Sequence, residues 1–274
     1  TQGRVRVTVV DVDRSVFVDD LQEGDVWLFP AGIPHSIQGL EEGCEFLLVF
    51  DDGKFSEYQT MLITEWFAHT PRDVLAKNFG VAESCFANIP KKEKYIFRLE
   101  VPPPLEEVRK RLPDHKPKTP FTWHASAQEP NRYDGGSTKV IDANNFPRTT
   151  LSALIIELEP GAMRELHWHP HADEWQYYLE GEARMTVFDA VNSARTFDYR
   201  AGDVGYVPRT LGHYIENIGS TTMRVINMFN SPHYQDVSLN QWMALTPPEL
   251  VKGHLNLDDT AMNALRREFR PVVR

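Results

Sequence analysis

The sequence predicts an all-β protein that contains two domains of the same kind, each a jelly-roll β-barrel with a few peripheral helices. Short segments in which apolar and polar residues alternate predict the strands, because alternation is typical of a strand with one buried face. Glycine and proline separate these segments, as they do in antiparallel barrels. A repeated sequence indicates that the unit occurs twice.

Strands are expected in five segments: GRVRVTVVD (3–11), LSALIIEL (151–158), ARMTVF (183–188), DVGYVP (203–208) and MRVINMF (223–229). Helices are expected after each copy of the repeat, over residues 72–79, 248–254 and 258–269. Asp258, Asp259 and Thr260 form a cap-like opening of the last helix. Trp66 and Trp242 occupy matching positions and are expected to be core aromatics that pack a helix on each barrel.

Three pairs of segments match at nearly constant spacing: residues 3–11 with 181–189, 24–35 with 202–213, and 65–71 with 241–247. Five of nine residues are identical in the first pair and five of twelve in the second, both at an offset of 178 residues. Such a constant register across three blocks is not expected by chance. The chain therefore contains two copies of one unit.

The two copies differ in what precedes them. A histidine-rich segment precedes Gly181, and its counterpart in the first copy would lie before Thr1. The first unit is therefore expected to lack its N-terminal part. We expect a first domain at residues 1–100, a proline-rich linker or arm at 101–130, and a second domain at 131–274.

Composition excludes several classes of function. The 274 residues are 41% hydrophobic and 25% charged, as in globular proteins. A formal net charge of −10 disfavours nucleic acid or an anionic membrane as a partner. Because no run of about 18 apolar residues occurs, no membrane span is expected. No targeting segment is visible, so a cytoplasmic and a secreted location both remain open.

The two cysteines, Cys44 and Cys85, do not form a CxxC pair, so no zinc site built from thiolates is expected. Two unrelated buried thiols are expected instead, although a single disulfide stays open.

The segment HWHPHADEW (167–175) predicts a metal site. His167 and His169 lie two residues apart, so on a strand both point to the same face. Glu174 returns to that face after a short loop, and His213 comes from a later strand. Three imidazoles and one carboxylate suit Mn or Fe, and also zinc, and leave two positions open on a six-coordinate ion. His171 is expected to be a solvated loop residue.

The histidine-rich block and the block that ends at His213 resemble the two motifs of the cupin superfamily. Residues 160–188, 194–219 and 236–242 are similar to the second domain of bicupin oxalate decarboxylases. Residues 24–60 and 67–81 are similar to the first domain of the same enzymes. The resemblance covers nearly the whole chain.

This resemblance implies Mn(II) in each cupin domain and the conversion of oxalate to formate and CO2, with O2 required but not consumed. It implies the metal ligands His167, His169, Glu174 and His213 in the second domain, and His35 in the first. Arg164 matches the family arginine that meets a carboxylate of the substrate. A guanidinium can pair with one carboxylate of oxalate while the metal binds the other.

Two sites depart from the family pattern. Glu57, in SEYQT (56–60), lies where family members carry a lid glutamate that moves the proton. Tyr58 and Gln59 differ from the usual lid, which leaves open whether the outcome is decarboxylation or oxidation. Asn227 occupies a position where family members carry a glutamate in the second domain. Because asparagine cannot carry a proton, turnover at the second site also stays open.

The predicted function is therefore Mn-dependent oxalate decarboxylase, and two alternatives remain. The first is an oxalate oxidase that forms H2O2 and CO2. The second is a metal-binding cupin without catalytic activity, which Asn227 favours and which Arg164 and the full ligand set disfavour. The resemblance also implies a homo-oligomer, as a trimer or as paired trimers.

Overall fold

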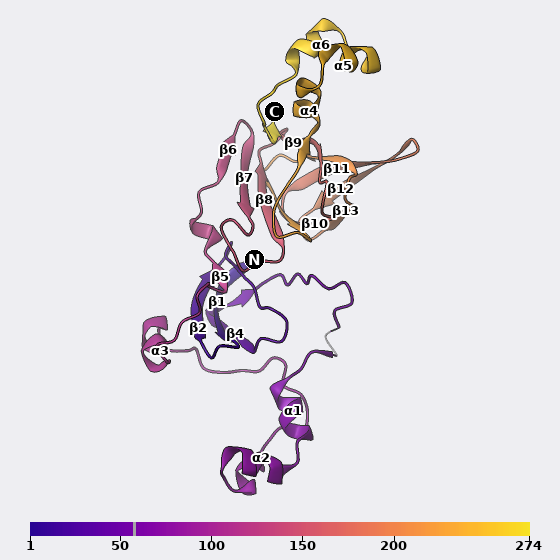
Figure 1. The fold of residues 1–274 in the computed structure, drawn as a ribbon. Coiled ribbons are helices and arrows are strands. Elements are labelled where there is room, and N and C mark those ends of the chain that lie inside the picture. Colours follow the sequence, from indigo (N-terminus) through magenta and orange to yellow (C-terminus); the bar gives the residue numbers. More distant parts are fainter. Residues whose placement is uncertain (57–58) are drawn as a thin grey trace.

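The computed structural model describes residues 1–56 and 59–274 and shows two β-rich units that lie end to end. Short helices project at both ends of the elongated molecule (Figure 1). The prediction of an all-β fold with peripheral helices is confirmed. In the described residues, no helix has both the length and the apolar character that crossing a membrane requires.

The first unit is built on an antiparallel sheet with the strand order β2-β1-β4. The strands of this unit are β1 (Gln2–Val10), β2 (Val16–Gln22), β3 (Val26–Trp27) and β4 (His35–Glu45). The alternation of β1 places Val5 and Val7 in a small core with Leu21. On the same strand, the buried Arg6 forms a two-point ion pair with Asp20.

Three short helices follow this sheet: α1 (Ile63–His69), α2 (Arg72–Phe79) and the 3-10 helix η2 (Glu83–Phe86). The bounds of α2 are those predicted. The expected burial of Trp66 on α1 is wrong, because α1 projects from the first unit (Figure 1) and buries none of its residues. The side chain of Trp66 is 61% exposed. Cys44 is half-buried, but Cys85 is exposed on η2, so the expectation of two buried thiols is wrong for Cys85.

The proline-rich arm has structure of its own. It contains α3 (Leu105–Arg111), β5 (Thr122–Trp123) and the 3-10 helix η3 (Ala125–Ala127). Strand β5 pairs with β3 through Val26 opposite Trp123 and Trp27 opposite Thr122. The arm therefore contributes a strand to the first unit.

The second unit consists of two antiparallel sheets, with the strand orders β13-β10-β15-β8-β7-β6 and β12-β11-β14-β9-β16. The strands are β6 (Asn131–Tyr133), β7 (Gly136–Ile141), β8 (Ser152–Leu158), β9 (Met163–Trp168), β10 (Glu174–Glu180), β11 (Glu182–Asp189), β12 (Ser193–Arg200), β13 (Val204–Val207), β14 (Gly212–Asn217), β15 (Met223–Phe229) and β16 (Val237–Ser238). A short C-terminal strand, β17 (Val272–Val273), also pairs with β9. Residues from both sheets, including Ile156, Tyr178 and Ile215, form one buried core between them.

Three helices follow: α4 (Leu239–Leu245), α5 (Pro248–Leu255) and α6 (Asp259–Ala264). As predicted, the side chain of Asp258 caps α6, accepting a hydrogen bond from the backbone N–H of Ala261. This helix is shorter than expected, because the N–H of Arg266 donates to the side chain of Asn240 instead of continuing the helix. Trp242 packs edge to face on Trp168, at 5.7 Å between ring centroids, yet is 55% exposed and not a core residue as expected.

His124 connects the arm to the first unit through both ring nitrogens. Its Nδ1 lies 3.1 Å from the carboxylate of Asp25, and its Nε2 lies 3.0 Å from that of Asp19. An imidazole can donate to two carboxylates only when both nitrogens carry protons. Partial burial alone would lower the pKa of His124, but the two aspartates outweigh burial and raise it.

We expect this contact to stabilise the fold more in mild acid than in mild base. The pKa of His124 is raised in the folded state, so its stabilising effect is complete below the ordinary value of 6.5 and is lost as pH rises through the raised value. Thermal unfolding of the wild type and of His124→Gln, followed from about pH 5 to about pH 9, checks this. The difference between the two melting temperatures should become smaller as pH rises. A constant difference would contradict the interpretation that a protonated His124 bridges the two aspartates.

Candidate metal centre

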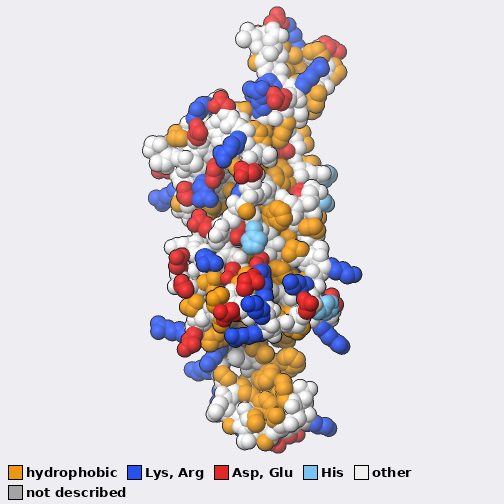
Figure 2. All heavy atoms as spheres, turned by 90° about the vertical axis from the view of Figure 1, so that its left-hand side faces the viewer, with side chains coloured by type: hydrophobic (Ala, Val, Ile, Leu, Met, Phe, Trp, Pro, Cys, Tyr) orange, Lys and Arg blue, Asp and Glu red, His pale blue; other side chains and the backbone are white. Residues whose placement is uncertain are grey.

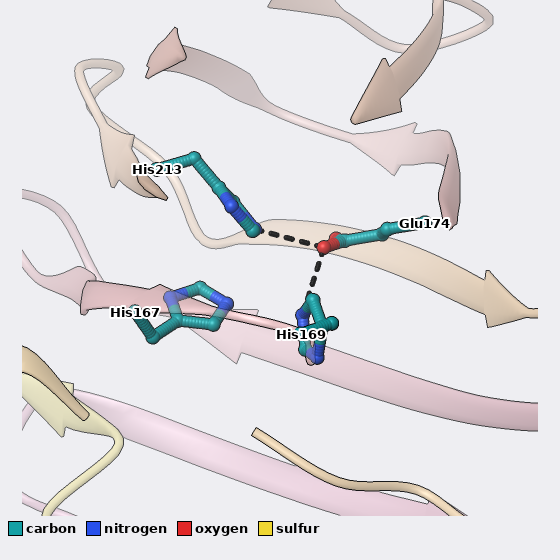
Figure 3. Close-up of side chains that lie close together, drawn as sticks. All are labelled: His167, His169, Glu174 and His213. Carbon is teal, nitrogen blue, oxygen red and sulfur yellow. Dashed lines mark hydrogen bonds and ion pairs between the residues drawn. The ribbon is translucent and has the colours of Figure 1, made fainter. Parts of the chain in front are cut away.

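Three histidines and one glutamate come together in the interior of the second unit (Figure 3). Their candidate ligand atoms lie within 4.8 Å of one another, and all four side chains are buried. They are the four residues selected from the sequence: His167, His169, Glu174 and His213.

Strand pairing explains how these residues meet. His167 on β9 lies directly opposite His213 on β14, within one sheet. His169 follows β9, two residues after His167, and so points to the same interior. Glu174 opens β10, which belongs to the facing sheet. The cluster therefore lies between the two sheets and receives residues from both.

Backbone carbonyls fix the protonation of the imidazoles. A carbonyl only accepts hydrogen bonds, so a ring nitrogen that contacts one carries the proton, and the other nitrogen of a neutral ring keeps its lone pair. Each Nδ1 has such a partner: His167 contacts the carbonyl of Glu165 at 2.6 Å, His169 that of Gln235 at 2.8 Å, and His213 that of Leu211 at 3.0 Å.

The three Nε2 atoms consequently direct lone pairs into the cluster. Within the described part of the chain, Nε2 of His167 and of His169 are buried and accept no hydrogen bond. Glu174 Oε2 lies 3.0 Å from Nε2 of His169 and 2.8 Å from Nε2 of His213. Lone pairs that converge on a carboxylate require a cation between them, so the site fits a divalent metal ion.

The pKa of His167 agrees with this chemistry. Burial, and secondarily the charge of Arg164, hold the pKa of His167 well below its ordinary value, which keeps this ring neutral. Neutral imidazoles and an ionised carboxylate are the forms that bind metal.

Arg164 is fully buried beside this cluster. It precedes His167 by three residues, and an irregularity in the pairing of β9 with β14 allows both side chains to face the interior. The guanidinium pairs with the carboxylate of Asp236 and donates to the hydroxyl of Tyr234 at 3.1 Å. Burial alone would lower the pKa of Arg164, but Tyr234 and Asp236 outweigh burial and raise it.

The other predicted site residues lie apart from this cluster. His35, on β4, is exposed and stacks on Phe29. Its Nδ1 lies 2.8 Å from the carbonyl of Ile33, the arrangement that His213 shows 178 residues later. In residues 1–56 and 59–274, the only group of three or more potential ligands is the one in the second unit. Glu57 lies outside the described residues.

The structure adds residues that sequence reasoning missed. Gln176 donates a hydrogen bond to Glu174. Because it follows Glu174 by two residues on the same strand, the sequence could have predicted that both side chains share one face. Tyr234 and Asp236 contact Arg164 from a distant part of the sequence, and no spacing pattern indicates this. His171 is exposed, as expected for a loop residue.

Two facing antiparallel sheets that enclose three histidines and one carboxylate, in a chain that contains the unit's sequence twice, define the class of two-domain β-barrel metalloproteins called bicupins. Comparisons with known proteins identify the family to which this chain belongs. The sequence model of the family described as Cupin matches residues 1–85 and 124–263.

Oxalate decarboxylase OxdC of Bacillus subtilis is 50% identical over 273 residues, which cover 99% of this chain and 71% of that protein. A probable oxalate decarboxylase of Arthroderma benhamiae is 37% identical over 278 residues, which cover 99% of this chain and 68% of that protein. A solved structure of the Bacillus subtilis enzyme, described for its Mn(II) centres, matches with a TM-score of 0.96 at 50% identity over 100% of this chain and 73% of that one. This chain belongs to the cupin family and, within it, to the bicupin oxalate decarboxylases.

Proposed function

We propose that this protein is a Mn(II)-dependent oxalate decarboxylase, which converts oxalate to formate and CO2 and requires O2 without consuming it. The observation that carries the proposal is the buried cluster of three histidines and one glutamate, in a chain half identical to an oxalate decarboxylase along 99% of its length. The negative net charge of the chain makes a local positive site necessary for a dianionic substrate.

We propose His167, His169, Glu174 and His213 as the ligands of Mn(II) in the second unit, and His35 as a ligand in the first. When bound, such an ion would supply Lewis-acid and redox chemistry for oxalate and O2. Arg164 supplies a buried positive charge for a substrate carboxylate, and Tyr234 and Asp236 orient its guanidinium.

The reaction needs a group that carries a proton. Hydrogen oxalate gives formate and CO2 with atoms and charge in balance, but its proton must move from a carboxyl oxygen to carbon. A carboxylate that accepts the proton and then returns it performs this step. We propose Glu57 for this role at the first unit.

The second unit supports a different proposal, because Asn227 stands in its interior and its side chain is fully buried. An amide can donate a hydrogen bond but cannot accept and return a proton at ordinary pH. We propose that the second site binds metal without turning over oxalate.

Removal of the Glu57 carboxylate tests the proposed reaction. Mn-loaded protein is incubated with labelled oxalate at mildly acidic pH, with and without O2, and formate and peroxide are measured together. Formate should form only with O2, and Glu57→Gln should lower its rate by about a hundredfold or more, the usual contribution of a proton-transfer group. Glu83→Gln, a neutralised acid on the exposed helix η2, is the control and should leave the rate unchanged.

The other outcomes separate the alternatives. Peroxide without formate would identify an oxalate oxidase. Bound manganese with neither product would identify a metal-binding cupin without this activity. An unchanged rate in Glu57→Gln would remove Glu57 from the mechanism.

The organisation of the chain is also proposed. We assign a first domain at residues 1–100, an arm at 101–130 and a second domain at 131–274. We propose a homo-oligomer, as a trimer or as paired trimers. Exposed apolar side chains on the projecting helices support it: Ile63, Trp66, Trp242, Leu245 and Leu250. In Figure 2, hydrophobic side chains gather on the lowermost lobe of the molecule.

A further inference from the structure

We infer that Gln176 and Asn227 are positioning residues that hold Glu174 as a one-oxygen metal ligand, and that residue 205 is glycine in order to leave room for Gln176. This inference rests on the proposed binding of metal by the second unit. It concerns residues that do not themselves belong to the ligand set.

The two oxygens of Glu174 have different partners. Oε2 faces the imidazoles, at 2.8 Å from His213 Nε2 and 3.0 Å from His169 Nε2. Oε1 accepts two hydrogen bonds, from Gln176 Nε2 at 2.8 Å and from Asn227 Nδ2 at 2.5 Å. Glu174, Gln176 and Asn227 are all 0% exposed, so water does not compete for these donors. With Oε1 engaged twice, Oε2 alone remains directed at the metal position.

The orientation of the Gln176 amide is itself fixed. The hydroxyl of Tyr178 donates to Gln176 Oε1 at 2.9 Å, which turns the NH2 group of the amide toward Glu174. Glu174, Gln176 and Tyr178 are alternate residues of β10 and are all buried on the same face. A chain of hydrogen bonds therefore runs along the strand from the core to the carboxylate ligand.

Neighbouring strands complete this arrangement on both sides of Gln176. Asn227 on β15 lies opposite Gln176 in the register of the sheet, and Gly205 on β13 lies opposite it on the other side. A Cβ atom at residue 205 would lie 2.4 Å from Gln176 Oε1 and 3.3 Å from Gln176 Cβ. Any side chain at this position would therefore displace the amide from Glu174.

Asn227 supports Glu174 because its side chain is uncharged. A carboxylate at residue 227 would place like charges in contact with Glu174 Oε1, whereas the amide N–H attracts that oxygen. Neither amide titrates at ordinary pH, so the support of Glu174 stays the same in acid and in base. Asn227 cannot carry a proton at the second site, but its amide favours the binding of metal there.

Metal binding by the intact protein tests the inference. The metal-free protein is titrated with MnCl2 by equilibrium dialysis, and the EPR fine structure of bound Mn(II) is recorded. Gln176→Leu and Asn227→Leu should each weaken Mn(II) affinity by about 10- to 100-fold, the usual effect of losing a partner that orients a ligand. Each should also change the EPR fine structure, because Oε1 becomes free to approach the metal.

Asn217→Leu is the matched control. Asn217 is another buried amide of the same barrel, and its side chain donates to the carbonyls of Leu158 and Thr221, not to a ligand. Its loss should lower the melting temperature while Mn(II) affinity and the spectrum stay as in the wild type.

A second pair of variants separates positioning from folding. Gly205→Ala should weaken Mn(II) affinity and alter the spectrum as Gln176→Leu does, although Gln176 is still present. The double variant Gly205→Ala/Gln176→Ala should have a higher melting temperature than Gly205→Ala, because removal of the Gln176 amide makes room for the new Cβ atom. Its Mn(II) affinity should stay low. Wild-type affinity and an unchanged spectrum in the Gln176, Asn227 and Gly205 variants would overturn the inference. Failure of the wild type itself to bind Mn(II) would instead overturn the proposed metal site.

Discussion

Replacement of His213 by alanine is expected to weaken Mn(II) binding in the second unit by at least about a hundredfold, more than the loss of a supporting residue. His213 supplies one of three lone pairs that converge on the metal position, and its ring is fully buried. Its Nδ1 is held by the carbonyl of Leu211, so Nε2 is the nitrogen that faces the metal position.

Equilibrium dialysis with MnCl2 and thermal unfolding with and without the metal measure this loss. A ligand that binds only the folded state raises the melting temperature, and His213→Ala should abolish that rise. His171→Ala, in the same histidine-rich segment but on an exposed loop, should bind Mn(II) like the wild type. Equal losses in both variants would mean that the segment binds manganese only loosely, outside the buried cluster.

Replacement of Arg164 by leucine is expected to lower the free energy of unfolding by about 3–5 kcal/mol, the usual cost of removing one partner of a buried ion pair. The side chain of Asp236 is 9% exposed and would lose the guanidinium that balances its charge. Tyr234 would lose the same partner, and burial already raises the pKa of its hydroxyl.

Urea unfolding of the metal-free protein measures this effect. Removing Asp236 as well, as Asp236→Leu in the Arg164→Leu background, should recover part of the loss, because no buried charge remains unpaired. Arg184→Ala is the control. It breaks an ion pair with Asp198 that is equally well formed but exposed, and it should leave unfolding unchanged. Similar losses in Arg164→Leu and Arg184→Ala would show that burial of the Arg164 pair has no energetic importance.

Periodicity in the sequence was sufficient for four strands of the second unit. Alternation predicted β8, β11, β13 and β15, since each has one face in the core between the sheets. The same rule placed His167 and His169 on one face, and the repeat drew attention to the block that ends at His213. These signals are local, so a single sequence is enough to show them.

The features that escaped prediction depend on packing between distant segments. The partnership of Arg164 with Asp236 joins residues from separate elements, and the irregular pairing that turns Arg164 inward leaves no mark on composition. Trp66 and Trp242 have the apolar character of core residues, but the helices that carry them project from the two units. Apolar character alone does not tell which surface covers a side chain.

The pairing of β5 with β3 has a consequence for chimeric proteins. A fragment that ends at residue 100 would leave Val26 and Trp27 without the strand that pairs with them. A fragment that begins at residue 131 would lose Gln128, whose side chain donates to the carbonyl of Val140 on β7. The sequence repeat and the folding unit therefore do not coincide. Because the arm contacts both units, exchange of one half between two relatives keeps both halves intact only when the arm still fits Val26 and Trp27 on one side and Val140 on the other.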